Sequence, residues 1–216
     1  MSPRRAKVLG EETSPGALRR HLIRVTQRLL AAHGVTGLTT RQIAREAQVA
    51  DGVLYNHFAG KDDLVLTALT EQATQQVDEF LAAVPEPGSA TLEANLTALG
   101  QAALAMAIGT VPLFTGLLGQ ERLLHGFFTG LHAEHGPQNA FSATIAYLRA
   151  EQALGRASDD VDAVAVAELL FGACQLRAFV GQMRPQDVAV PLAEPGEPED
   201  LDAVVAVLIR ALRPTP

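Results

Sequence analysis

Residues 39–64 read TTRQIAREAQVADGVLYNHFAGKDDL, and the prediction of the fold starts from this stretch. Thr39 and Gln42 have the spacing of a capping box, in which the two side chains satisfy free N–H groups at the start of a helix. This helix is predicted to end near Ala47. After a three-residue turn, a second and shorter helix is predicted from Asp51 to His57.

Apolar residues in the same stretch are spaced to lock the two predicted helices together at a fixed angle, as a helix-turn-helix requires. They are Ile43, Ala44, Ala47, Val49, Leu54 and Phe58. The side chains left to point outward from the short helix are Asp51, Val53, Tyr55, Asn56 and His57. A helix of about seven residues is too short to be stable alone, so we expect a surrounding bundle to hold it for an external purpose. The alternative is an alanine-rich helical hairpin with a solvated polar face.

The order Thr40-Arg41-Gln42-Ile43-Ala44, then GVLYNHF at 52–58, then Lys61 and Leu64 resembles the signature of the tetracycline-repressor (TetR) family. The resemblance covers residues 1–65 and extends downstream only in length and helical layout. It implies a ligand-responsive transcriptional regulator that binds double-stranded operator DNA, with repression as the default. It also implies a small-molecule effector and a homodimer on a palindromic operator.

Carried over by position, the resemblance assigns DNA contacts to Thr40, Arg41, Val53, Tyr55, Asn56, His57 and Lys61, and Asp51 is predicted to belong to the same surface. Thr40 and Arg41 are implied to touch backbone or bases, and Val53 and Asn56 to face base edges. Tyr55, His57 and Lys61 are implied to reach phosphates. The chemistry agrees, because tyrosine hydroxyls donate to phosphate oxygens and a lysine beside a helix N-terminus adds its charge to free N–H groups.

The chain departs from the family pattern at three positions around the short helix. Gln48 and Ala50 stand where the family usually has Gly and Ser, so the hydroxyl N-cap is missing. Asp51 is expected to substitute by capping or by favouring the helix dipole. Its charge repels phosphate, so Asp51 is expected to point away from the DNA backbone or to accept from a cytosine amino group. Val53 replaces a common Thr and is suited to a thymine methyl.

The net charge of −7 argues against nucleic acid when taken alone, but the charge is unevenly distributed. Residues 1–64 hold ten Lys or Arg and six Asp or Glu, a net of +4. Residues 65–216 hold seven basic and eighteen acidic residues, a net of −11. This asymmetry indicates a phosphate-facing head, although an acidic surface with a chance basic tail gives the same numbers.

Helical spacing dominates the chain and predicts an all-α fold of about nine or ten helices. The first is predicted to start at Ser14-Pro15 and to stop at Gly34; a fourth runs from near Lys61 to the Pro85-Glu86-Pro87-Gly88 linker. Later helices are predicted at 89–108, 111–119, 121–135, 138–155, 161–183 and 199–213, with a loop at 185–198. The predicted domains are a flexible basic arm (1–13), a three-helix DNA-binding domain (14–64) and a larger ligand-binding and dimerisation domain (65–216).

Whether Arg4, Arg5 and Lys7 form a minor-groove arm or a tail with no role stays open.

The helices at 161–183 and 199–213 are the most apolar, and the resemblance implies that they form the homodimer interface; a monomeric core is the alternative. The predicted ligand pocket consists of Met106, Phe114, His125, Phe128, His132, Phe171, Cys174, Gln175 and Phe179, against the alternative that such residues are simple core. One helical stripe holds Glu121, His125, Phe128, His132 and His135, and a metal or polar-ligand site there is the alternative to histidines on a partly wet face that need no metal. No metal and no cofactor are predicted.

Several other classes find no support in the sequence. No apolar run follows the basic N-terminus and none reaches membrane-spanning length, so neither export nor membrane insertion is expected. A single cysteine, Cys174, fits a reducing cytoplasm. Gly60-Lys61-Asp62 is no phosphate loop, and no GxSxG or HExxH occurs, so an enzyme is not predicted. The remaining alternative is a small-molecule binding or scaffold protein that has lost DNA binding.

Overall fold

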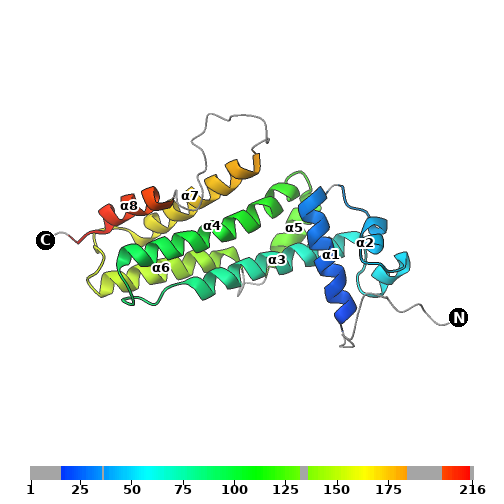
Figure 1. The fold of residues 1–216 in the computed structure, drawn as a ribbon, viewed down its shortest axis with the longest axis horizontal. Coiled ribbons are helices and arrows are strands. Elements are labelled where there is room, and N and C mark those ends of the chain that lie inside the picture. The colour runs from blue at the N-terminus through cyan, green and yellow to red at the C-terminus, as the bar shows by residue number, and fades with distance from the viewer. Residues whose placement is uncertain (1–15, 36, 132–135, 184–200, 215–216) are drawn as a thin grey trace. The chain divides into compact units, whose positions relative to one another are not determined.

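The computed structural model describes residues 16–35, 37–131, 136–183 and 201–214, and all regular structure in these ranges is helical. Its elements, shown in Figure 1, are α1 (Ala17–His33), α2 (Thr40–Glu46), the 3₁₀ helix η1 (Asp51–Asn56), α3 (Lys61–Ala83), α4 (Leu92–Leu117), α5 (Glu121–Gly130), α6 (Pro137–Ala153), α7 (Ala163–Met183) and α8 (Leu201–Leu212). The all-α prediction is confirmed.

Three predictions of helix extent are wrong, and one of them is the helix predicted at 121–135, which ends at Gly130. α1 begins at Ala17, after Gly16 in the left-handed conformation (φ 88°), rather than at Ser14-Pro15. α4 is one helix where two were predicted, and it continues through Pro112. Proline removes one N–H from the helical ladder, and Pro112 lies on the exposed side of α4.

The chain forms two compact units, and α3 and α4 each contribute to both. The first unit contains residues up to Gln72 and Leu113–Leu131. Within it, α2 packs on both α1 and η1. Five of the six predicted locking residues, Ile43, Ala44, Ala47, Leu54 and Phe58, are at most 4% exposed, and Val49 is half-buried. The predicted interlock between the helices is therefore present.

The second unit contains residues Ala73–Pro112 and those from His132 onward. Its core joins the second half of α3, most of α4, α6, α7 and α8. Gly100 of α4 lies where α7 and α8 meet this helix, and a Cβ added there would make ordinary contacts of 3.5 to 3.8 Å with atoms of Leu170, Leu201 and Val205. The rings of Phe80 and Phe141 each pack against Phe171, with centroids 5.6 and 5.7 Å away.

The expectation that no apolar stretch reaches membrane-spanning length is wrong, because helices α4 and α7 are long and apolar enough to cross a membrane by length and composition alone. In the fold, 56% of the apolar stretch of α4 and 39% of that of α7 is buried. A core helix of a compact protein has the same composition, so these helices are accounted for in part by the packing of the second unit.

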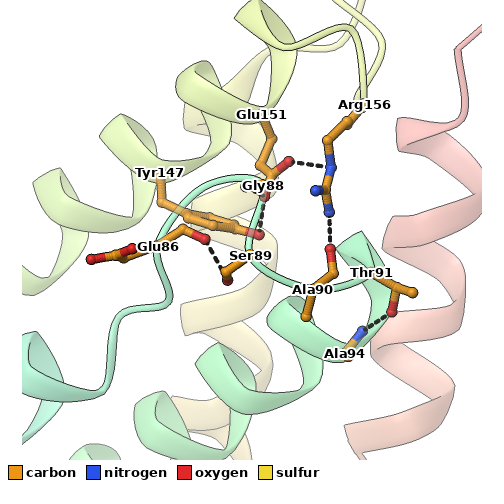
Figure 2. A network of polar contacts seen from close by, with 9 residues as sticks. All are labelled: Glu86, Gly88, Ser89, Ala90, Thr91, Ala94, Tyr147, Glu151 and Arg156. Carbon is orange, nitrogen blue, oxygen red and sulfur yellow. Dashed lines mark hydrogen bonds and ion pairs between the residues drawn. The ribbon is translucent and has the colours of Figure 1, made fainter.

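A buried charged cluster holds the connection between α3 and α4 against α6 (Figure 2). The carboxylate of Glu151 is fully buried; its Oε1 accepts hydrogen bonds from the Tyr147 hydroxyl (2.8 Å) and the Gly88 N–H (3.1 Å). Its Oε2 lies 2.9 Å from Nε of Arg156, and the same guanidinium donates to the Ala90 carbonyl. Burial, and then the hydrogen bond to Glu151, raise the pKa of Tyr147 above its ordinary value. The predicted linker at 85–88 is thus tied to the core rather than free.

Candidate nucleic-acid interface

The short helix η1 presents one side to solvent and anchors the other. Leu54 and Phe58 are 3% and 4% exposed and face the core of the first unit. Tyr55, Asn56 and His57 are exposed, Tyr55 to 61%. A helix of six residues cannot persist alone, so the two buried anchors hold the polar side chains in place.

The start of α2 is fixed by the predicted capping box. The Thr39 hydroxyl accepts from the Gln42 N–H at 3.2 Å, and the Gln42 Oε1 accepts from the Thr39 N–H at 2.9 Å. Of the next two residues, Thr40 is half-buried and the Arg41 side chain is 89% exposed. The box therefore holds Arg41 on a rigid first turn with its guanidinium exposed to solvent.

Asp51 is at the start of η1, and its carboxylate pairs with Arg41. The Arg41 Nε lies 3.7 Å from the Asp51 Oδ2, and the Asp51 side chain is 65% exposed. The N-cap of η1 is Ala50, with no side-chain cap, so Asp51 does not replace the missing hydroxyl by capping. Of the two roles expected for Asp51, capping is not observed. The remaining role is a favourable interaction between its negative charge in the first turn and the helix dipole.

The turn between α2 and η1 contains a strained residue. Gln48 has φ 55°, and it is the one non-glycine with positive φ in the part of the chain that the structure describes. Its N–H donates to the Arg45 carbonyl at 3.1 Å, which fixes the turn. A side chain in the left-handed region costs about 1–2 kcal/mol, and this explains why the family usually has glycine there.

Lys61 opens α3 and already has a partner within the chain. Its ammonium donates to the Leu38 carbonyl at 3.3 Å, and the side chain is half-buried. Asp63, two residues on, accepts from the Ala59 N–H at 2.8 Å and so caps the helix start. The ammonium thus lies near the segment that leads into α2. A phosphate oxygen that accepts from it would either replace the Leu38 carbonyl as acceptor or bind the ammonium beside it.

Sequence reasoning missed the polar side chains that hold α1 against the other helices. The Arg19 guanidinium lies 5.1 Å from the centroid of the Phe58 ring and 3.5 Å from Glu71 on α3. The His21 Nε2 lies 3.2 Å from the carbonyl oxygen of Ala47, at the end of α2. A usable signal was present, because Arg19 precedes the buried pair Leu22 and Ile23 by three and four residues and so shares their face.

The residues predicted to line a pocket fall into separate groups. Met106, Phe171 and Cys174 belong to the core of the second unit, or pack against it. Phe114 and Phe128 belong to the first unit, with ring centroids 6.0 Å apart. His125, Gln175 and Phe179 are exposed. His132 lies outside the described residues, as do His135, the arm at 1–13 and the loop at 185–198.

Cys174 is a buried member of the second core. Its thiol lies 3.7 Å from the Gly100 carbonyl, which it can reach as a weak donor. Burial raises the pKa of this thiol to about 11. Among the described residues, no three His, Cys, Asp or Glu side chains gather as a metal site would require.

Comparison with known proteins finds a family match for the N-terminal part of the chain. The family described as bacterial regulatory proteins, tetR family, matches residues 22–68, which include most of α1, all of α2 and η1, and the start of α3. No protein in the curated comparison matches the chain.

Solved structures share the fold over most of the chain. A TetR-family transcriptional regulator from Mesorhizobium loti has a TM-score of 0.68 at 16% identity and covers 90% of this chain and 94% of its own. The fatty acid degradation regulator FadR from Bacillus halodurans has a TM-score of 0.64 at 18% identity, with coverage of 91% and 96%. FadR from Bacillus subtilis, in complex with stearoyl-CoA, has a TM-score of 0.59 at 16% identity, with coverage of 90% and 100%.

At such identities the structural likeness shows the fold, and the family match at residues 22–68 supplies the assignment. The matched segment is the one in which η1 is anchored by Leu54 and Phe58 and flanked by the capped start of α2. The N-terminal segment at residues 22–68 therefore matches the tetR family of bacterial regulatory proteins, and the chain as a whole shares its fold with solved TetR-family regulators.

Proposed function

We propose that the chain is a cytoplasmic, ligand-responsive repressor that binds a palindromic operator as a homodimer and is released by a small-molecule effector. The observation that carries the DNA-binding part is η1, a short helix whose inner side is buried and whose outer side is polar and exposed. A helix of this kind gains nothing for the fold by exposing Tyr55, Asn56 and His57, but it suits the major groove.

The phosphate contacts are proposed to come from residues around this helix. Tyr55 and His57 extend from η1, and Lys61 lies at the start of α3 with its ammonium near the Leu38 carbonyl. Each is a donor that a phosphate oxygen can accept from. The uneven charge of the chain, +4 over residues 1–64 and −11 over the rest, favours an approach by this end.

Dimerisation is proposed to use one face of α7 together with α8. Leu169, Leu176 and Met183 on α7 are 62%, 61% and 53% exposed and recur every seven residues. Gly172 and the partly exposed Phe179 fall between them at the spacing of the second position of a heptad. Such a seam is typical of helices that pack against each other. On α8, Val207 is 60% exposed and extends the apolar surface of the same unit.

The effector is proposed to bind within the larger domain. FadR from Bacillus subtilis was solved with stearoyl-CoA, and the regulator FrrA is described as flavonoid-responsive. In this chain, Met106 and Phe171 are apolar side chains of the second unit, and Phe171 packs on the rings of Phe80 and Phe141. These residues favour an effector with an apolar part, and no enzymatic step belongs to the proposal.

Release is proposed to follow from a shift between dimer arrangements. An effector that prefers a dimer whose two recognition helices are wrongly spaced would lower the affinity for both half-sites together. A coupling free energy of about 1–3 kcal/mol corresponds to a change of roughly 5- to 150-fold in DNA affinity, which is enough for a switch.

A DNA-binding titration tests the proposal directly. The full chain is titrated against the duplex flanking its own gene, with a scrambled duplex of equal length as control, at rising salt. We expect a specific complex at low salt that weakens steeply as salt rises. Absence of any specific complex at low salt would contradict the assignment. If the chain bound small molecules yet enriched no sequence from a random duplex library, the alternative of a binding protein without DNA contact would replace it.

A further inference from the structure

The Arg41–Asp51 pair is the one place where the exposed face of the helix-turn-helix carries opposite charges in contact, among the residues that the structure describes. The Arg41 Nε and the Asp51 Oδ2 are 3.7 Å apart, and the side chains are 89% and 65% exposed. A pair this exposed contributes little to the stability of the fold. Stability therefore does not explain why an acidic residue lies on the surface that is proposed to bind DNA.

The geometry of the pair leaves a defined set of groups free. Arg41 meets the carboxylate through Nε, so both of its terminal nitrogens keep their N–H donors. Asp51 meets the guanidinium through Oδ2, so Oδ1 stays available as an acceptor. Two donor nitrogens and one acceptor oxygen of this exposed pair therefore remain available to another molecule.

This set matches one base pair. In the major groove, a G·C pair presents the guanine N7 and O6 acceptors and, beside them, the cytosine N4 donor. An A·T pair presents acceptor, donor, acceptor and a methyl group, which does not match. We propose that Arg41 and Asp51 act as one reading unit for a single G·C pair in each half-site. Arg41 donates to guanine N7 and O6, and Asp51 accepts from cytosine N4.

The backbone supports a fixed spacing between the two side chains. Arg41 follows the capping box on the first turn of α2, and Asp51 begins η1. Between them, Ala47 and Leu54 are buried and hold the two helices together. The pair also carries no net charge, so it has little attraction for phosphate, and this separates it from Tyr55 and Lys61. The inference rests on the proposed DNA binding.

The test compares base preferences of full-length variants, selected on a random duplex library and then titrated on single-substitution duplexes. Wild type is expected to prefer G·C at one position of each half-site by roughly 5- to 150-fold. Arg41→Ala and Asp51→Ala are each expected to lose this preference at that same position and to keep the others. The double variant is expected to lose no more there than either single variant, because the two residues act together.

Glu46→Gln serves as the matched control, since it removes one negative charge from the exposed other end of α2. It is expected to keep the G·C preference. Far-ultraviolet circular dichroism confirms that each variant is folded. The inference is overturned if the two alanine variants relax different positions, or if they bind DNA with the wild-type preference intact. A wild type that selects no sequence at all would instead overturn the proposed function.

Discussion

Two acid–base pairs in this chain have the same chemistry and opposite surroundings. Arg41 and Asp51 are exposed to 89% and 65% and lie 3.7 Å apart. Arg156 and Glu151 are exposed to 29% and 0% and lie 2.9 Å apart. The exposed pair can exchange its partner for groups of another molecule, whereas the fully buried Glu151 carboxylate cannot lose Arg156 without leaving a charge out of water. Burial, rather than residue type, decides which pair holds the fold and which is available for recognition.

The comparison is tested most strongly by Glu151→Ala. The substitution leaves the Arg156 guanidinium, the Tyr147 hydroxyl and the Gly88 N–H without their carboxylate. Loss of one partner from a buried pair typically costs about 3–5 kcal/mol, so we expect a loss of this size in the free energy of unfolding, measured in urea. A loss below about 1 kcal/mol would show that the cluster is not a structural anchor.

A smaller effect is expected from Tyr147→Phe, which removes one hydrogen bond to the buried carboxylate at 2.8 Å. Hydrogen bonds to charged groups contribute about 1.5–3 kcal/mol, and the unfolding free energy at neutral pH should fall by that order.

The same variant gives a pH signature. Because the folded pKa of Tyr147 is raised above its ordinary value of 10.0, its contribution is complete below pH 10.0 and is lost as pH rises beyond it. Wild type should therefore lose stability above that pH more steeply than Tyr147→Phe. Parallel curves for the two proteins in alkaline urea titrations would contradict this.

Gln48→Gly is expected to stabilise the head. Glycine removes left-handed strain of about 1–2 kcal/mol, and it adds about 0.5–1 kcal/mol of entropy cost. The expected net gain in the free energy of unfolding in urea is therefore about 0–1.5 kcal/mol. Gln75→Gly, on an exposed turn within α3, is the control and should instead cost about 1 kcal/mol. Equal losses for both would indicate that the φ of 55° at Gln48 carries no strain.

The smallest effect on stability is expected from Asp51→Ala. Exposed ion pairs contribute about 0–1 kcal/mol, so its unfolding free energy should stay within that range of wild type. The value for Asp51→Ala is then compared with that for Glu151→Ala, which is measured under the same urea conditions. A loss approaching that of Glu151→Ala would mean that the exposed pair also holds the fold.

The parts of the structure that sequence could predict are local ones. The capping box at Thr39 and the anchors Leu54 and Phe58 follow from spacings within a few residues, and both are present. The unbroken course of α4 could not be predicted, because proline usually ends a helix and only the packing shows that Pro112 is exposed. The pairing of Arg41 with Asp51 depends on the angle between two helices, which no spacing reveals.

The Glu151 cluster was missed because it joins Gly88 to a residue 63 positions away. A signal for it did exist in α6. The buried residues Ala140, Thr144, Tyr147 and Leu148 recur at helical spacing, and Glu151 falls on the same stripe. A charged residue on an otherwise core-facing stripe predicts a buried partner, although the sequence does not say which one.

The single thiol of Cys174 can report on the opening of the second unit. A thiol that is 1% exposed, with a pKa of about 11, reacts with alkylating reagents only when the surrounding helices open. Because the chain has one cysteine, each opening event that is captured adds one mass increment per molecule. A compound that binds only the closed form slows this labelling, so mass spectrometry can screen for effectors with no DNA present and no dye attached.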